Sequence, residues 1–139
     1  MKLELVEALK TGHDDIDGDH ERIIDTINTI THTANSGGSW DALLSLLDAF
    51  LSACEAHFRK EEGILADAGY PGLIEHTAYH DQMLAKARRA HLRCTQAECP
   101  ESCRPHIQEM VELMVDDIVR SDMGFASFLQ AKGLARPRR

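Results

Sequence analysis

Aromatic residues are scarce in this chain, and so are long apolar runs. Phe, Trp and Tyr make up only 5% of the 139 residues, so Leu, Ile, Val, Met and Ala carry the apolar content. This composition favours helices packed on helices over a β-sandwich. No apolar stretch approaches the length of a membrane span, and Glu4 and Glu7 interrupt the N-terminal segment where a signal peptide would be continuously apolar. We therefore expect a cytoplasmic protein with no membrane partner.

Basic residues are also in deficit. The chain has 15 Lys and Arg against 23 Asp and Glu, which gives a net charge of −8. Such a surface repels phosphate backbones, so nucleic acid is excluded as an expected partner. The chain has 4 cysteines, too few for a disulfide scaffold at this length. In a reducing compartment we expect thiols, metal ligands or redox switches.

Apolar residues recur every three or four positions in four stretches, each bounded by turn residues. The pattern predicts helices at roughly 14–36, 40–67, 72–94 and 106–132, with a loop at 95–105. Long amphipathic helices with mostly short connections predict an all-α, up-down-up-down antiparallel four-helix bundle. The length fits one domain over residues 1–139.

Several polar residues fall in phase with the apolar stripes, at positions that a bundle normally keeps apolar. A single inward His or acid is usually an ordinary core residue or a misassigned helix face. Here the coincidence extends to all the predicted helices. The residues are His20 in the first helix, His57 and Glu61 in the second, His76 and His80 in the third, and Asp117 and Asp122 in the fourth.

Buried carboxylates need a partner, because each one costs several kcal/mol unless it is paired or coordinated. Metal cations are the candidate compensation on these stripes, and a mixed set of His and carboxylate ligands suits iron, manganese or zinc. The seven side chains are too many for one ion, so two ions bridged by carboxylates are expected. The Glu-x-x-His pairs of ferritin-like sites and the zincin motif His-Glu-x-x-His are absent.

At these residues the chain resembles the hemerythrin family over nearly its whole length. Residues 12–20 read GHDDIDGDH, similar to the GH..ID..H opening of bacterial hemerythrins. Residues 57–62 read HFRKEE, similar to the family's HF..EE segment, and are followed by Gly69-Tyr70-Pro71. Residues 76–80 read HTAYH, which matches HxxxH. The fourth motif begins with His in the family and here reads DIVRSD at 117–122.

The resemblance implies that Glu61 and Asp122 bridge two irons. It assigns His20 and His57 to the iron with the open O2 position, and His76 and His80 to the other. The third terminal ligand of that second iron would be a histidine, and Asp117 replaces it. We expect Asp117 to coordinate, because an inward acid otherwise lacks a partner; the alternative is a water in that place. Asp116 is a competitor whose spacing to Asp122 does not match.

The function that the resemblance implies is O2 binding, storage or sensing by a non-heme diiron protein, rather than by a dedicated enzyme. A carboxylate in place of neutral imidazole adds negative charge, which stabilises the oxidised state, so we expect a site prone to autoxidation. One alternative is a diiron oxidase or peroxidase acting on O2 or H2O2. Another is a metal-binding or redox-sensing module without turnover. Manganese and zinc remain alternatives to iron.

The loop before the fourth predicted helix concentrates thiols and imidazoles. His91, Cys94, Cys99, Cys103 and His106 fall within 16 residues. Free thiols, a zinc chelate and a disulfide are all open, and we expect reversible disulfide formation among Cys94, Cys99 and Cys103, with Cys54 protected by burial. Four residues are expected outside the site: His13 before the first helix, His32 on the surface, and Lys60 and Glu62 on a solvated face.

Overall fold

The computed structural model describes residues 3–137, except for the side chains of residues 100 and 121–123. Over this range the chain is helical and contains no β-strand. Its elements are the 3-10 helix η1 (Glu7–Leu9) and the α-helices α1 (Asp14–Asn35), α2 (Trp40–Ala68), α3 (Leu73–Thr95), α4 (Pro100–Gly124) and α5 (Ala126–Ala131).

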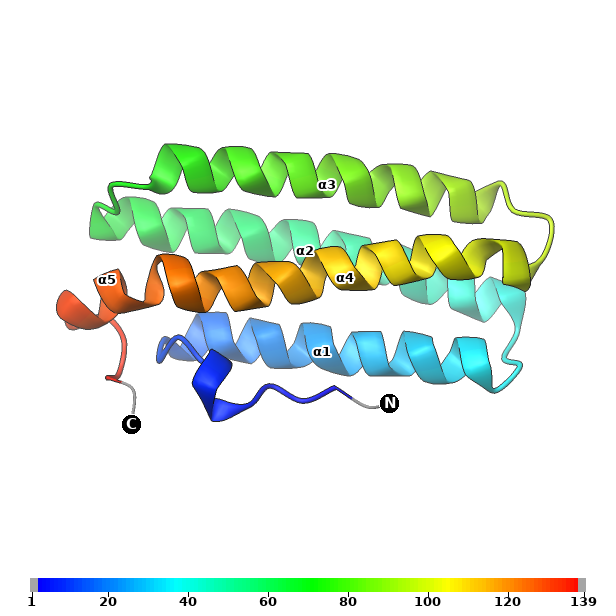
Figure 1. Ribbon diagram of the computed structural model, residues 1–139, viewed down its shortest axis with the longest axis horizontal. Helices are drawn as coiled ribbons and strands as arrows, with labels where there is room; N and C mark the ends of the chain where they lie inside the picture. Colours follow the sequence, from blue (N-terminus) through cyan, green and yellow to red (C-terminus); the bar gives the residue numbers. More distant parts are fainter. Residues whose placement is uncertain (1–2, 138–139) are drawn as a thin grey trace.

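The long helices lie side by side, each running opposite to the one before it (Figure 1). The helices α1 and α2, α2 and α3, and α3 and α4 pack against each other, and α1 also contacts α4. This arrangement confirms the antiparallel bundle expected from the sequence. None of the helices in the described range is both long and apolar enough to cross a membrane.

Local chemistry sets the ends of these helices. The side chain of Ser39 accepts a hydrogen bond from the backbone N–H of Ala42 and so caps the start of α2. Gly69 ends α2 in the left-handed conformation, with φ of 72°. His13 lies just before α1, and its Nδ1 accepts the backbone N–H of Ile16, so the expectation that His13 precedes the first helix is confirmed.

The fourth helix differs from the prediction at both ends. It begins at Pro100 instead of 106, because proline is well suited to the first turn, where its missing N–H has no partner to lose. Pro105 is also accommodated inside this helix. After Gly124 the chain breaks at Phe125 and continues as the separate α5, which ends before Gly133 as expected.

The core consists of two apolar clusters. The larger contains the stripes of all four long helices, including Ile23, Phe58 and Met114. The smaller lies near α5 and consists of Ile16, Leu65, Phe125 and Leu129. On α1, His20 lies between Ile16 of one cluster and Ile23 of the other, and on α2, Glu61 lies between Phe58 and Leu65. A polar layer therefore separates the two clusters.

Candidate metal centre

The polar layer gathers side chains from all four long helices. His20 comes from α1, His57 and Glu61 from α2, His76 and His80 from α3, and Asp117 from α4. Five of these residues are buried, and the His76 side chain is 12% exposed. Their donor atoms form two overlapping groups, each with all its atoms within 4.8 Å of one another: His20, His57, Glu61 and Asp117, and Glu61, His76 and His80.

Glu61 belongs to both groups, and its two oxygens face different histidine pairs. The oxygen Oε2 lies 3.0 Å from Nε2 of His57 and 3.8 Å from Nε2 of His20. The oxygen Oε1 lies 2.7 Å from Nε2 of His76 and 3.2 Å from Nε2 of His80. Each oxygen thus shares a small space with two imidazole nitrogens, which is the arrangement of a carboxylate that can bridge two ions.

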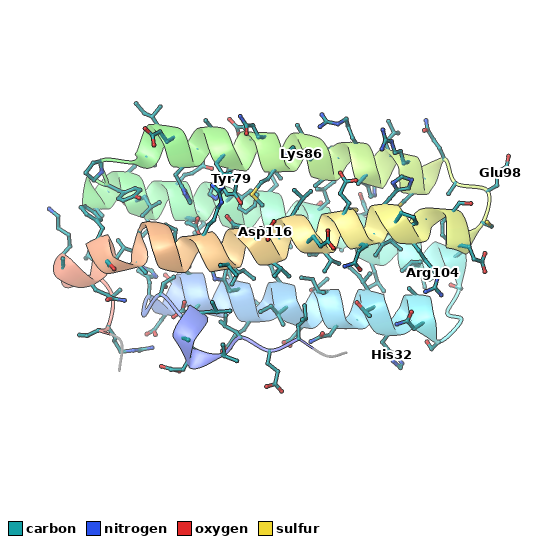
Figure 2. The ribbon with its side chains drawn as sticks, viewed as in Figure 1. His32, Tyr79, Lys86, Glu98, Arg104 and Asp116 are labelled. Carbon is teal, nitrogen blue, oxygen red and sulfur yellow. The ribbon has the colours of Figure 1, made fainter. Side chains whose placement is uncertain are left out.

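Asp117 lies between the two histidine pairs. Its carboxylate is fully buried, and Oδ1 is 3.4 Å from Nε2 of His80. It also belongs to the group of His20, His57 and Glu61, so its reach extends beyond the single ion to which the sequence analysis assigned it. The competing residue Asp116 is exposed and drawn on the outside of α4 in Figure 2. The side chain of Asp122 lies outside the described residues.

The donor atoms fit cations better than they fit each other. Nε2 of His20 and Nε2 of His57 face each other at 3.1 Å, which places two imidazole nitrogens where one ion would be held. In the described part of the chain, the buried atoms Glu61 Oε2 and His80 Nε2 have no hydrogen bond of acceptable geometry. Buried polar atoms are rarely left in this state. Imidazole and carboxylate are the donors that suit iron, manganese or zinc.

Charge in the metal-free cluster is balanced by protons on the histidines. Burial raises the pKa of Glu61, but its contacts with His57, His76 and His80 outweigh burial and hold the pKa well below the ordinary range. Burial lowers the pKa of His80, but Asp117 and Glu61 raise it to about 10. Burial, assisted by the neighbouring His57, lowers the pKa of His20. Cations would replace these protons, which couples metal binding to proton release.

Two carboxylates that sequence reasoning did not select hold the outer nitrogens of the histidines. Oδ2 of Asp19 lies 2.9 Å from Nδ1 of His57, and Oε2 of Glu62 lies 2.8 Å from Nδ1 of His80. Such contacts fix the tautomer and orientation of a ligating ring. The expectation of a solvated face for Glu62 is therefore wrong, since its side chain is only 14% exposed.

Cationic side chains anchor these two carboxylates. Nζ of Lys60 lies 3.1 Å from Asp19, and Arg22 contacts the same carboxylate. Burial raises the pKa of Asp19, but His57, Lys60 and Arg22 together lower it to about 2. Arg59 binds Glu62 at 2.9 Å. Lys60 is half-exposed, as a solvated residue should be, but its ammonium group supports the site.

The remaining histidines lie away from the centre. His32 is exposed and drawn at the outer edge of α1 in Figure 2, so its expected surface position is confirmed. His91 lies 3.9 Å from Asp48. The zinc chelate considered for the segment from His91 to His106 has no support, since within the described chain no three metal-binding side chains gather there.

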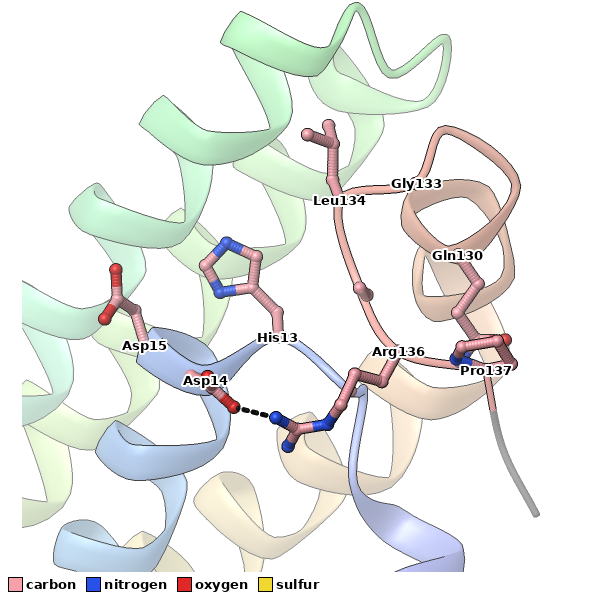
Figure 3. Close-up of a pocket in the computed structure, with 10 residues that line it drawn as sticks. His13, Asp14, Asp15, Gln130, Gly133, Leu134, Arg136 and Pro137 are labelled. Carbon is pink, nitrogen blue, oxygen red and sulfur yellow. Dashed lines mark ion pairs between the residues drawn. The ribbon is translucent and has the colours of Figure 1, made fainter.

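A surface pocket of about 680 Å³ lies where the C-terminal segment packs against the start of α1 (Figure 3). It is lined by residues 12–15 and by Gln130 with residues 133–137, and it shares no residue with the metal-binding groups. Asp14 and Arg136 form an ion pair of 2.7 Å at its rim (Figure 3). This pocket is therefore separate from the buried centre.

Comparison with known proteins supports the interpretation of the buried cluster. The family model of the hemerythrin HHE cation binding domain matches residues 11–129. A protein of Stenotrophomonas maltophilia named bacteriohemerythrin is 30% identical over 116 residues, which are 84% of this chain and 73% of that protein. Bacteriohemerythrin of Ralstonia nicotianae is 27% identical over 118 residues, covering 78% of this chain and 82% of the relative.

The shared region is shorter in another relative. Bacteriohemerythrin of Pseudomonas paraeruginosa is 29% identical over 87 residues, and the match spans only 56% of its length. The family match includes every described residue of the two metal-binding groups, from His20 to Asp117. The chain therefore belongs to the hemerythrin family and carries a non-heme metal centre of the type for which the HHE cation binding domain is named.

Proposed function

We propose that this chain is a diiron protein that binds O2, with a site richer in carboxylate than the motifs it resembles. The observation that carries the proposal is Glu61, whose two oxygens each face a separate pair of histidines. A dinuclear centre needs such a bridging carboxylate, and a site for one ion does not. When bound, two irons supply the reversible two-electron chemistry by which O2 is held.

The proposed ligand set assigns a role to each residue. Glu61 and Asp122 are the bridging carboxylates, and His20 and His57 hold the iron with the open position for O2. His76 and His80 hold the second iron. Asp117 is the terminal ligand in the place where the family motif has histidine. Its full burial and its 3.4 Å distance to Nε2 of His80 support coordination by the carboxylate.

Asp117 sets the chemical character of the proposed site. A carboxylate ligand carries a negative charge that neutral imidazole lacks, and this charge favours the higher oxidation state of the metal. We infer that the oxygenated protein converts to the oxidised form readily, so that the protein senses or stores O2 only while reductant is available. The reduced thiols and this need for reductant fit a cytoplasmic protein.

A diiron oxidase or peroxidase is the second candidate, and the same residue favours it. A site that does not release O2 unchanged has the chemistry to consume O2 or H2O2. The two candidates differ in turnover, which steady H2O2 production or consumption with excess reductant would detect. A metal-binding or redox-sensing module without turnover would bind iron and change oxidation state without consuming either substrate.

The proposal is tested by metal analysis joined to visible spectroscopy. The purified protein is reduced without air, its spectrum is recorded, and air is then admitted and removed. We expect iron, and a visible band that appears with O2 and partly disappears when O2 is removed. Protein that contains only zinc, or iron whose spectrum does not respond to O2, would refute the proposal.

A further inference from the structure

Two thiols meet at the end of the bundle farthest from α5, where α3 connects to α4 (Figure 1). Cys94 is in the last turn of α3 and Cys103 is in the first turn of α4, and both side chains are 0% exposed. Sγ of Cys94 lies 3.8 Å from the backbone oxygen of Cys103, and the two thiols are hydrogen-bonded to each other. Both belong to the larger apolar cluster.

The register of the two helices explains this meeting. Cys94 lies 14 residues after His80, and Cys103 lies 14 residues before Asp117. Because α3 and α4 are antiparallel and 14 residues make about four full turns, residues that face each other at one level face each other again at the next. His80 and Asp117 are in contact, so Cys94 and Cys103 are brought together about 21 Å away along the helices.

Cys99 is placed differently although it is close in sequence. It lies in the connection between the helices, is partly exposed, and has Sγ 3.2 Å from Oγ of Ser102. Figure 2 shows Glu98 in the same connection, directed away from the bundle. Of the three cysteines that the sequence analysis grouped here, the structure therefore pairs the two that are buried.

We propose that Cys94 and Cys103 are a modification site, a dithiol that a two-electron oxidant such as hydrogen peroxide converts to a disulfide joining α3 to α4. One thiolate attacks the peroxide and becomes a sulfenic acid with release of water. The second thiol displaces a second water and forms the S–S bond. In total, two thiols lose two protons and two electrons, and one peroxide becomes two waters.

Burial controls the rate at which this disulfide forms and breaks. Burial raises the pKa of both thiols, so few thiolates are present and reaction depends on transient opening of the helix ends. The same burial protects the disulfide from reductants once it has formed. The cross-link fastens the two helices that carry His76, His80 and Asp117, and it does not depend on which metal the centre holds.

The test treats the full-length protein with hydrogen peroxide, quenches with catalase, blocks the remaining thiols after unfolding, and maps disulfides by mass spectrometry. We expect a Cys94–Cys103 disulfide that dithiothreitol reverses, and a melting temperature higher by on the order of 5 °C in the oxidised form. The Cys94→Ala and Cys103→Ala variants should lose both effects. Alanine keeps the positions apolar, and circular dichroism of each variant reports whether it folds.

Cys99→Ala is the matched control, because Cys99 lies in the same connection and outside the pair. It should keep the disulfide and the rise in melting temperature. A disulfide that includes Cys99, sulfinic acid on Cys94 or Cys103 in place of a cross-link, or an unchanged melting temperature after oxidation would overturn the proposal.

Discussion

Asp19 shows how a residue outside the metal-binding groups can decide whether they bind metal. Its carboxylate holds Nδ1 of His57 at 2.9 Å, which leaves Nε2 directed at Glu61. Losing such a contact typically lowers metal affinity by about 10- to 100-fold. We expect Asp19→Asn to lower iron affinity by this factor, measured by competition with a chelator. Asp25→Asn, an exposed acid on the same helix, should leave affinity unchanged, and equal effects of the two would contradict the assignment.

Asp117 carries the proposed chemical difference from the motif that the chain resembles. Replacing it by histidine removes one negative charge from the buried layer. If Asp117 is a ligand, Asp117→His should raise the reduction potential of the iron centre and lengthen the lifetime of the oxygenated form, as measured by spectroelectrochemistry and by the decay of the visible band in air. An unchanged potential would show that the charge argument is wrong.

At the scale of helices, Gly12 joins the two ends of the chain. Its backbone oxygen accepts the N–H of Arg136 at 3.0 Å, its φ is +89°, and an added Cβ would lie 2.2 Å from the backbone oxygen of Arg136. We expect Gly12→Ala to destabilise the protein by about 1–3 kcal/mol in urea unfolding.

Gly63 provides the opposite case within α2. It is exposed, and nothing lies within 4 Å of an added Cβ. Gly63→Ala should stabilise the protein by about 0.5–1 kcal/mol, because alanine loses less backbone entropy in a helix. Changes of the same sign in the two variants would contradict the view that the contact with Arg136 makes Gly12 necessary.

Hydropathy periodicity was sufficient to predict the helices, and turn residues were sufficient for most of their ends. The fourth helix was misjudged because Pro100 and Pro105 both suggested a loop, whereas proline in the first turns of a helix is tolerated. The break at Phe125 gave no signal in the periodicity, because both α4 and α5 keep apolar residues in phase.

The same limit applies to the site. His20, His57, Glu61, His76, His80 and Asp117 could be selected because they interrupt apolar stripes, and the structure brings them together. Asp19 and Glu62 lie beside the stripes and reach the histidines of a neighbouring helix. Their roles depend on how the helices are rotated against each other, which one-dimensional spacing does not contain.

At the scale of the whole molecule, the layer of charged groups between two apolar clusters links stability to pH and metal. In the metal-free protein, burial lowers the pKa of His80, but Asp117 and Glu61 raise it from 6.5 to about 10. A raised pKa contributes stability that is fully present below 6.5 and is lost as the pH rises toward 10. A bound metal removes this dependence, because a coordinated nitrogen has no proton to lose.

We therefore expect the melting temperature of the metal-free protein to fall between pH 7 and pH 9.5, and that of the iron-loaded protein to fall less. Circular dichroism at several pH values measures both. A fall of the same size in the two forms would show that the titrating groups lie outside the cluster.

The most direct test of the whole account is the number of irons that one chain holds through Glu61. Native mass spectrometry of iron-loaded protein counts ions on each folded molecule, and Glu61→Gln removes the bridging charge while preserving the size of the side chain. We predict two irons on the unmodified chain, and one or none on the variant. One iron on the unmodified chain, or two on both proteins, would contradict a centre built around Glu61.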